Sequence, residues 1–181
     1  MANMFKQQSD SSLEAYKKFF LVLFDSIYIN SIKVRGRQVT VQGKVFPTNR
    51  IMKNPFLTLK NKFPDLELYK VVGSIDMSFS KIDTLEGFPR IIEGSLNCFN
   101  VGLRSLIGGP EKVTGYFNVE YNKIESLGGA PAYVGKEFNI ARNLIKSLHG
   151  ISEYIGGDLI CSDNPGWTFN RPIGLQGNLI Q

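Results

Sequence analysis

The feature that most constrains this chain is an internal repeat of 21 residues that begins at Val71. Five successive rows place apolar residues in the same five columns, and 24 of these 25 positions are apolar, whereas a hydrophobic content of 43% would give about 11 by chance. The columns are Val71, Ile92, Val113, Val134 and Ile155; Ile75, Leu96, Phe117, Phe138 and Leu159; Met77, Cys98, Val119, Ile140 and Cys161; Ile82, Leu103, Ile124, Ile145 and Gly166; and Leu85, Leu106, Leu127, Leu148 and Phe169.

A coil of this length cannot bury its apolar side alone, so the repeats are expected to stack as a solenoid around one continuous core. Residues 71, 75 and 77 have one parity and predict a short strand with one buried face. A glycine column inside the strand leaves room for a close backbone approach or a bend. Its members are Gly73, Gly94, Gly115 and Gly157, with Lys136 as the exception.

The corner after each strand carries a polar residue in most rows, notably Asn122, Asn143 and Asn164. An asparagine amide can satisfy backbone groups that leave the strand ladder, and stacked coils can share such bonds. Glycines at 87, 108, 129 and 150, with prolines two residues after the first three, then return the chain to the next coil.

The pattern carried by Ile75, Met77, Ser80, Ile82 and Leu85, and by the four rows that follow, resembles the leucine-rich repeat. The segments GSLNC (94–98) and SLIGGP (105–110) are similar to leucine-rich-repeat proteins encoded by tailed bacteriophages and some bacteria. The likeness covers residues 71–169. It departs from the commoner family pattern at Val72 and its equivalents, where leucine is replaced. The resemblance implies a scaffold for protein binding rather than a reaction.

Residues 1–70 differ in composition from the repeats. Residues 11–26 are expected to form a helix, because Ser11 and Glu14 fit a capping box and an apolar stripe from Leu13 to Ile27 has helical spacing. Residues 28–34 and 39–46 predict a hairpin around a basic turn. The helix is expected to cap the exposed end of the array, or alternatively to dock on another protein.

These readings combine into an α+β fold. We expect a leucine-rich-repeat solenoid of about five coils with parallel strands over 71–169, capped by an N-terminal helix and β-hairpin. Residues 1–70 form the N-terminal helix, basic hairpin and a divergent cap in this division, and residues 170–181 form a C-terminal tail. Residues 47–70 contain three prolines and do not fit the 21-residue register.

Few residues could run a reaction. His149 has no arguable nucleophile and acid beside it, and three groups in one pocket are needed for a triad. Cys98 and Cys161 are three coils apart, beyond disulfide reach, and are expected to be buried thiols. We therefore predict no enzyme, no cofactor and no metal site. The longest early apolar run (19–24) is too short to span a membrane, and we expect a cytoplasmic protein, with the virion as an alternative location.

The outward side of the strands is the first candidate binding surface. Aromatic residues outside a core are costly unless they cover something, and Tyr and Arg are favoured anchors in interfaces. The alternative is that the asparagines only bond along the ladder and the rings only cover each other. The candidate residues are Asp76, Phe79, Asn97, Phe99, Tyr116, Asn118, Glu120, Tyr121, Asn139 and Arg142.

A basic cluster is the second candidate surface. Residues 1–70 carry twelve Lys and Arg against five Asp and Glu, a net charge of +7, within a chain of net charge +5. Such a cluster could meet nucleic-acid phosphates or an acidic protein patch, although no nucleic-acid motif accompanies it and a solvated face is the reading we favour. Its members are Lys33, Arg35, Arg37, Lys44, Arg50, Lys53, Lys60 and Lys62.

The leading hypothesis from sequence is a phage-encoded, non-enzymatic interaction protein whose strand-lined face binds a host or phage protein. The first alternative is a virion or assembly component that packs through its N-terminal helix and hairpin. The second is a nucleic-acid-binding module that uses the basic cluster.

Overall fold

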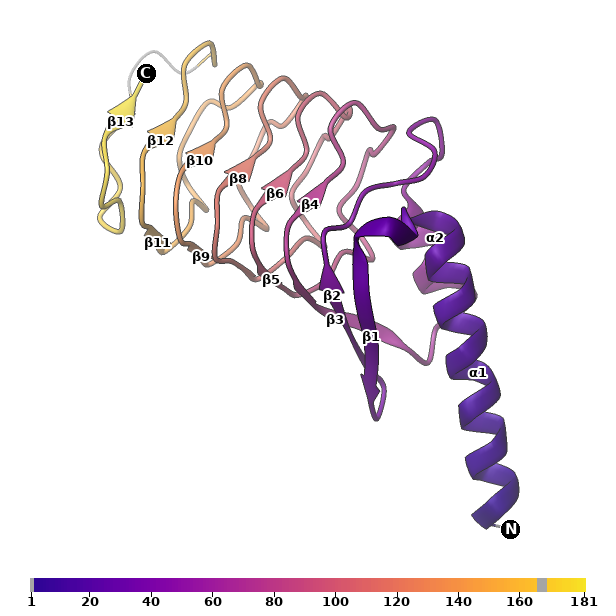
Figure 1. The fold of residues 1–181 in the computed structure, drawn as a ribbon. Coiled ribbons are helices and arrows are strands. Elements are labelled where there is room, and N and C mark those ends of the chain that lie inside the picture. Colours follow the sequence, from indigo (N-terminus) through magenta and orange to yellow (C-terminus); the bar gives the residue numbers. More distant parts are fainter. Residues whose placement is uncertain (1, 166–168) are drawn as a thin grey trace.

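The computed structural model describes residues 2–165 and 169–181, with side chains from residue 11 onward. It is a β-solenoid whose coils lie side by side, with two helices at the N-terminal end and the C-terminus at the other (Figure 1). Gly166, expected in the fourth apolar column, lies outside the described residues. The equal length of the coils accounts for this arrangement, because residues 21 apart meet in neighbouring coils.

Each complete coil contributes one short strand to each of two sheets. The first sheet has the order β1-β2-β3-β5-β7-β9-β11, and the second has the order β13-β12-β10-β8-β6-β4. The strands of the first are β1 (Ile29–Arg35), β2 (Gln38–Gly43), β3 (Glu67–Val72), β5 (Ile91–Glu93), β7 (Lys112–Val113), β9 (Tyr133–Val134) and β11 (Tyr154–Ile155). Those of the second are β4 (Ile75–Asp76), β6 (Leu96–Asn97), β8 (Phe117–Asn118), β10 (Phe138–Asn139), β12 (Leu159–Ile160) and β13 (Leu179–Ile180).

Strand pairing follows the sequence period. Leu96 pairs with Phe117, and Phe117 pairs with Phe138, so partners are 21 residues apart. All these pairs are parallel, and only the β1–β2 hairpin is antiparallel among the named strands. The hairpin expected at 28–34 and 39–46 is confirmed and joins the first sheet through β2 and β3.

The single strand expected over 71–77 is divided in two by its glycine. Gly73 has a φ of 145°, and the chain bends there between β3 and β4. A side chain at Gly94 would overlap the backbone of Gly73 in the preceding coil. The glycine column therefore has both of the roles expected from the sequence, a bend in the chain and a close approach between backbones. The bend separates the two sheets.

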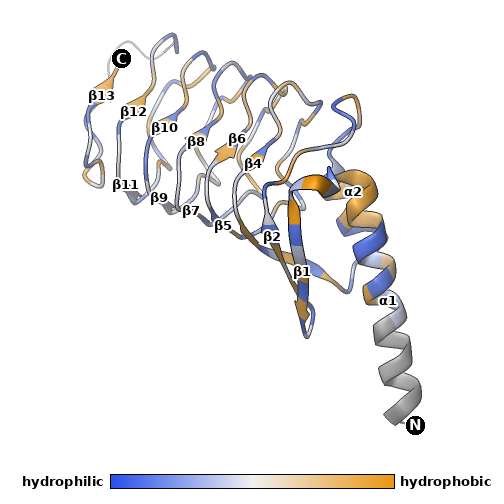
Figure 2. Ribbon diagram, in the orientation of Figure 1, coloured by the Kyte–Doolittle hydropathy of each residue, from blue (hydrophilic) through white to orange (hydrophobic). Residues whose placement is uncertain are grey.

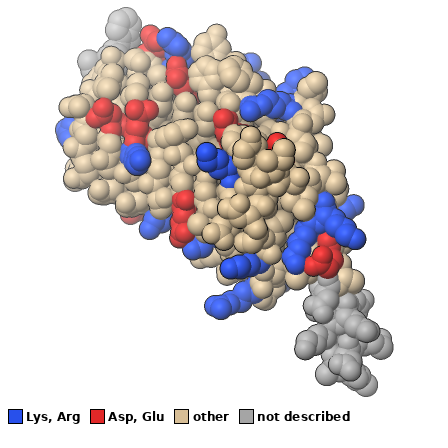
Figure 3. Space-filling view, viewed as in Figure 1, with Lys and Arg blue, Asp and Glu red and all other residues tan. Residues whose placement is uncertain are grey.

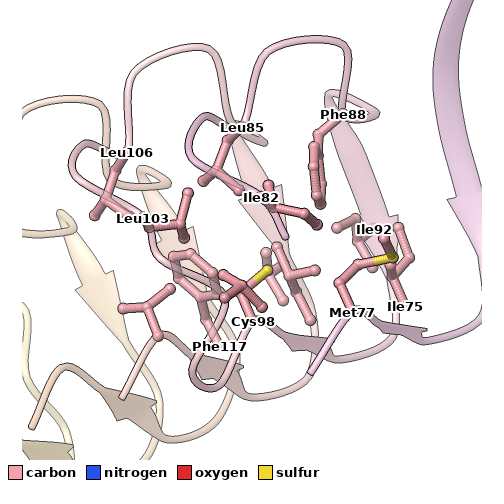
Figure 4. Packing of buried hydrophobic residues seen from close by; sticks show 14 of the residues in the cluster. Ile75, Met77, Ile82, Leu85, Phe88, Ile92, Cys98, Leu103, Leu106 and Phe117 are labelled. Atoms are coloured by element: carbon pink, nitrogen blue, oxygen red, sulfur yellow. The ribbon is translucent and has the colours of Figure 1, made fainter. Parts of the chain in front are cut away.

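The core is the predicted set of columns. The described members of the first four columns are at most 2% exposed, and the fifth is buried except for the partly buried Leu148. Figure 4 shows Met77, Cys98 and Phe117 pointing into the space that Ile82 and Leu103 close from the opposite side. The ribbon coloured by hydropathy places apolar residues on the strands and on the helix ends that meet the array (Figure 2).

The corner asparagines bond as expected. The Asn143 amide nitrogen donates to Ile140 O and Ala141 O in its own coil and to Val119 O in the preceding one. Its Oδ1 accepts from the Ile124 N–H. Asn122 and Asn164 make the equivalent bonds, so three successive corners join each coil to its neighbour.

The N-terminal helix caps the array, with different bounds from those expected. α1 (Ala2–Leu23) begins before Ser11, which is therefore not its N-cap. The helix ends earlier because Asp25 instead caps a 3-10 helix, η1 (Ser26–Tyr28), by accepting from the Ile27 N–H. Ile27, expected on the buried stripe, is 82% exposed as a result. Tyr16, Phe20, Leu23 and Phe24 of the stripe are buried, and Leu13 is partly buried.

A second helix links α1 to the first coil. α2 (Pro55–Lys62) was not expected from the sequence. Asn54 caps it by accepting from the Leu57 N–H, and the Asn54 amide donates to Thr84 O and Glu86 O in the first return segment. Phe56 lies 4.7 Å from Phe24 and 4.3 Å from Phe88 between ring centroids, which makes the cap continuous with the core.

The segment 170–181, treated as a tail in the sequence analysis, continues the stacking. Leu175 forms a bridge with Ile155 of the first sheet, and β13 pairs with β12 of the second. Its backbone thus covers the strands that the fifth coil would otherwise leave at the edge.

Candidate protein-binding face

The outward side of the second sheet brings together most of the residues selected from sequence. Asp76, Asn97, Asn118 and Asn139 occupy equivalent positions in β4, β6, β8 and β10. Each side chain accepts a hydrogen bond from the N–H two residues later in its own coil, at 2.9 to 3.2 Å. These four residues therefore shape the turn that follows each strand, and they are half-buried rather than projecting.

The turns after the second sheet contain a column of residues with left-handed backbone. Its φ values lie between 50° and 60°. This conformation is unfavourable for residues other than glycine and asparagine. The backbone N–H of Phe79 donates to Phe99 O in the next coil, and the N–H of Tyr121 donates to Ala141 O, so the conformation keeps the coils bonded at the corner. The column consists of Phe79, Asn100, Tyr121, Arg142 and Asp163.

An aromatic row runs along this edge. We define it as Phe79, Phe99 and Tyr121, which come from three consecutive coils. Phe99 lies between the other two, with ring centroids 5.2 Å from Phe79 and 6.1 Å from Tyr121. The rings cover each other in part, yet Phe79 remains 63% exposed and Tyr121 55% exposed. The row is therefore an exposed aromatic surface. The backbone N–H groups of Phe79 and Tyr121, its two outer members, are hydrogen-bonded to the next coil.

Charged residues continue the edge beyond the aromatic row. Arg142 bridges Glu120, at 3.1 Å, and Asp163, at 3.3 Å. The Asn139 amide also donates to Glu120, at 3.1 Å. This network is fixed by contacts from three coils and leaves one carboxylate in excess.

Tyr116 is on the same sheet but does not join the row. It immediately precedes β8, and its N–H donates to Ser95 Oγ, whereas the row lies beyond the opposite ends of the strands. Sequence reasoning did not include Asn100 and Asp163 among the candidate binding residues, although both lie in the 21-residue register of Phe79, Tyr121 and Arg142.

The basic cluster is divided among three segments. Lys33, Arg35 and Arg37 are on the hairpin, Lys44, Arg50 and Lys53 precede α2, and Lys60 and Lys62 are on α2. Several of these side chains already have partners within the chain. Arg37 bonds Asp65 O, Arg50 bonds Ser78 O, Lys60 pairs with Glu86, and Lys62 lies over the Phe19 ring.

The charge distribution separates the two candidate surfaces. Figure 3 shows acidic side chains over the part of the array near β10 and β12, and lysine and arginine side chains gathered near the helical end. The aromatic row and its charged continuation therefore form a surface distinct in character from the basic N-terminal part.

Groups with reactive chemistry are separate from this face. Cys98 and Cys161 are buried free thiols, as expected. Burial raises the pKa of Cys98, and it raises the pKa of Cys161 to about 11. His149 is exposed in a return segment. In the described part of the chain, no group of His, Cys, Asp and Glu is arranged to hold a metal ion.

No helix among the described residues combines the length and the apolar character that crossing a membrane requires. Comparison of the chain with protein-family models, curated proteins and solved structures found no match.

Proposed function

We propose that this chain is a non-enzymatic, leucine-rich-repeat-type module, encoded by a phage, that binds a host or phage protein through the aromatic row and its charged continuation. The observation that carries the proposal is that Phe79 and Tyr121 occupy left-handed corners and remain exposed. Asparagine or glycine would suit these corners better, so local stability does not account for the rings. Locally unfavourable residues at exposed positions are typical of functional surfaces.

The proposed surface is organised before contact. Coil-to-coil backbone bonds hold each corner, and the Asx bonds of Asp76, Asn97 and Asn118 fix the turns that lead to it. Binding to such a surface orders few groups, so little conformational entropy opposes association. Exposed Tyr and Phe with a neighbouring Arg also match the residue types that dominate interface energies.

The test is a double substitution, Phe79→Asn with Tyr121→Asn, that removes the rings without disturbing the backbone. Asparagine accepts left-handed φ values, so the variant is expected to fold with unchanged or greater resistance to urea. Each ring is expected to contribute at least about tenfold to affinity, as interface anchors do. Affinity purification from the native host, followed by mass spectrometry, identifies the partner, and titration with the purified partner gives the dissociation constants.

The matched control is Asn100→Gly, which changes the same column in the coil between the two rings and removes no aromatic surface. It is expected to bind as the wild type does. A partner retained with equal affinity by the double variant would refute the proposed face.

A specific observation favours an assembly role as the second candidate. Val22, Ile27 and Ile51 are exposed near the cap. Two hydrogen bonds join the end of α1 to the segment after β2: the Thr48 hydroxyl donates to Val22 O, and the Asp25 N–H donates to Phe46 O. If this surface mediates assembly, Val22→Asp with Ile27→Asp should lower the sedimentation coefficient of a concentrated sample or release the chain from particles, and Phe79→Asn should not.

A further inference from the structure

The first sheet ends at β1, the outer strand of the hairpin. In the sheet order β1 stands at one end, and it pairs only with β2. It has seven residues, whereas most strands of the coils have two. Figure 1 shows that the hairpin projects beyond the coils. A long strand with one side unpaired is a template on which another strand can form hydrogen bonds.

The register of the hairpin fixes which backbone groups lie on the open side. Arg35 and Gln38 pair directly across a two-residue turn. In such a hairpin the closing pair exchanges its hydrogen bonds, and bonded pairs then alternate along the strands. The N–H and C=O groups of Ile32 and Val34 therefore point away from β2. Within the described residues, no backbone group bonds them from that side.

The side chains of β1 alternate in character between the two faces of the sheet. Ile32 and Val34 are partly buried and pack against the hydrophobic core. Because the sheet ends beside them, a further strand would cover the surface that they leave exposed. Lys33 and Arg35 project from the opposite face and are exposed. In the part of the chain that the structure describes, neither cation has a carboxylate partner.

These two cations decide what can add to the edge. Pairing β1 with β1 of a second copy would gather Lys33 and Arg35 of both copies on one face, and like charges on neighbouring strands are destabilising. A strand with carboxylates on that face would instead be stabilised by opposite charge. The net charge of +7 on residues 1–70 also attracts an acidic segment from a distance. Charge therefore excludes a second copy and favours an acidic partner.

We propose that the open edge of β1 binds an extended acidic segment of a partner protein, in which apolar residues alternate with Asp or Glu. The backbone of Ile32 and Val34 exchanges hydrogen bonds with the segment, its apolar side chains cover these two residues, and its carboxylates lie beside Lys33 and Arg35. This is recognition by strand addition, in which the main chain supplies affinity and alternate side chains supply specificity. The site belongs to the first sheet and does not depend on the aromatic row.

The test uses fluorescein-labelled synthetic peptides and the full chain. The probe is the peptide TVEVEVT, and its charge control is TVKVKVT, both with blocked termini. Fluorescence anisotropy should show that the glutamate peptide binds at least about tenfold more tightly, and that added salt weakens it. Amide NMR should show that exchange of the Ile32 and Val34 N–H groups with solvent slows when the glutamate peptide is bound.

Backbone methylation separates strand addition from simple charge attraction. In the proposed pairing the valine N–H groups of the peptide point to β1, and the glutamate N–H groups point away. Methylating the valine amide nitrogens should abolish binding, whereas methylating the glutamate amide nitrogens should leave it nearly unchanged. Both modified peptides carry the same charge as the probe.

A charge reversal in the protein tests the face that carries the cations. Lys33→Glu with Arg35→Glu should invert the preference, so that the lysine peptide binds more tightly. The matched control is Lys123→Glu with Lys146→Glu, which makes the same change in charge at exposed positions of the array and should bind as the wild type does. Far-UV circular dichroism should be the same for all three proteins.

Four results would overturn the proposal. They are no binding of the glutamate peptide up to millimolar concentration, equal or tighter binding of the lysine peptide by the wild type, equal effects of the two methylation patterns, and unchanged exchange at Ile32 and Val34 with the peptide bound. Loss of the aromatic row by Phe79→Asn with Tyr121→Asn should leave peptide binding intact.

Discussion

At the scale of single residues, the asparagines of the coils show how burial decides what a polar side chain does. Asn143 is 4% exposed and satisfies four backbone groups in two coils. In contrast, Asn139 serves one turn and one carboxylate on the half-exposed strand face. Two asparagines four residues apart therefore have different roles, which burial separates.

Asn143→Ala is expected to lower the free energy of unfolding by about 2 to 4 kcal/mol, because it leaves buried backbone groups without partners. Asn139→Ala is the matched control and should cost about 1 kcal/mol or less. Urea denaturation of both variants measures the difference. Equal losses would show that the corner does not depend on this side chain.

The two thiols are expected to differ in alkylation. The thiolate is the reactive form, and with a pKa of about 11 only about one Cys161 side chain in a thousand is ionised at pH 8. Because the raised pKa moves ionisation of the thiol to higher pH, the alkylation rate of Cys161 should rise about tenfold per pH unit and level off near pH 11. Cys98 has no exposed surface, whereas Cys161 is 2% exposed, so Cys98 should be alkylated more slowly.

Mass spectrometry of the native chain after timed exposure to iodoacetamide measures both rates, and the chain in urea gives the reference in which both thiols react quickly. Faster labelling of Cys98 than of Cys161 in the native chain would contradict the burial described here.

At the scale of elements, the bend between the two sheets is the feature on which the coil depends. Two short strands separated by a glycine turn the chain around the core, and neighbouring coils approach most closely at that glycine. The cost of this packing is that a glycine is needed where the backbones touch. It stands in the column of Gly73, or, in the coil that has Lys136 there, at the preceding Gly135, whose Cβ would overlap Thr114 O.

Gly94→Ala is therefore expected to destabilise the chain by at least about 2 kcal/mol, because its Cβ would overlap the Gly73 backbone. Gly128→Ala is the control, since the nearest atom to its added Cβ is Ser126 Oγ at 3.6 Å. The control should change the midpoint of thermal unfolding by a few degrees at most. A tolerated Gly94→Ala would mean that the coils do not approach each other at this column.

Some elements of the fold could be predicted from the sequence and others could not, for physical reasons. The apolar columns were predictable because the period of the core is the period of the chain. The division at Gly73 was not, because parity is the same for a continuous strand and for two strands joined by a bend. α2 lies outside the 21-residue register, although Asn54 and Pro55 are a recognisable helix start. The left-handed column was hidden because Phe, Tyr and Arg carry no signal for that conformation.

At the scale of the whole molecule, the stacking converts a repeated sequence into surfaces with different properties. One edge carries the aromatic row and its ion pairs, the cap end carries most of the excess positive charge, and the first sheet ends in the open edge of β1. Because each coil contacts mainly its neighbours, a partner on one edge should touch short segments that recur every 21 residues.

Hydrogen–deuterium exchange of the chain with its purified partner tests this account most directly. Binding should slow amide exchange in segments 76–80, 97–101 and 118–122, and leave the return segments 104–109 and 125–130 unchanged. Slowed exchange confined to the return segments, or to residues 22–51 around the cap, would contradict the proposal that the corner edge is the binding surface.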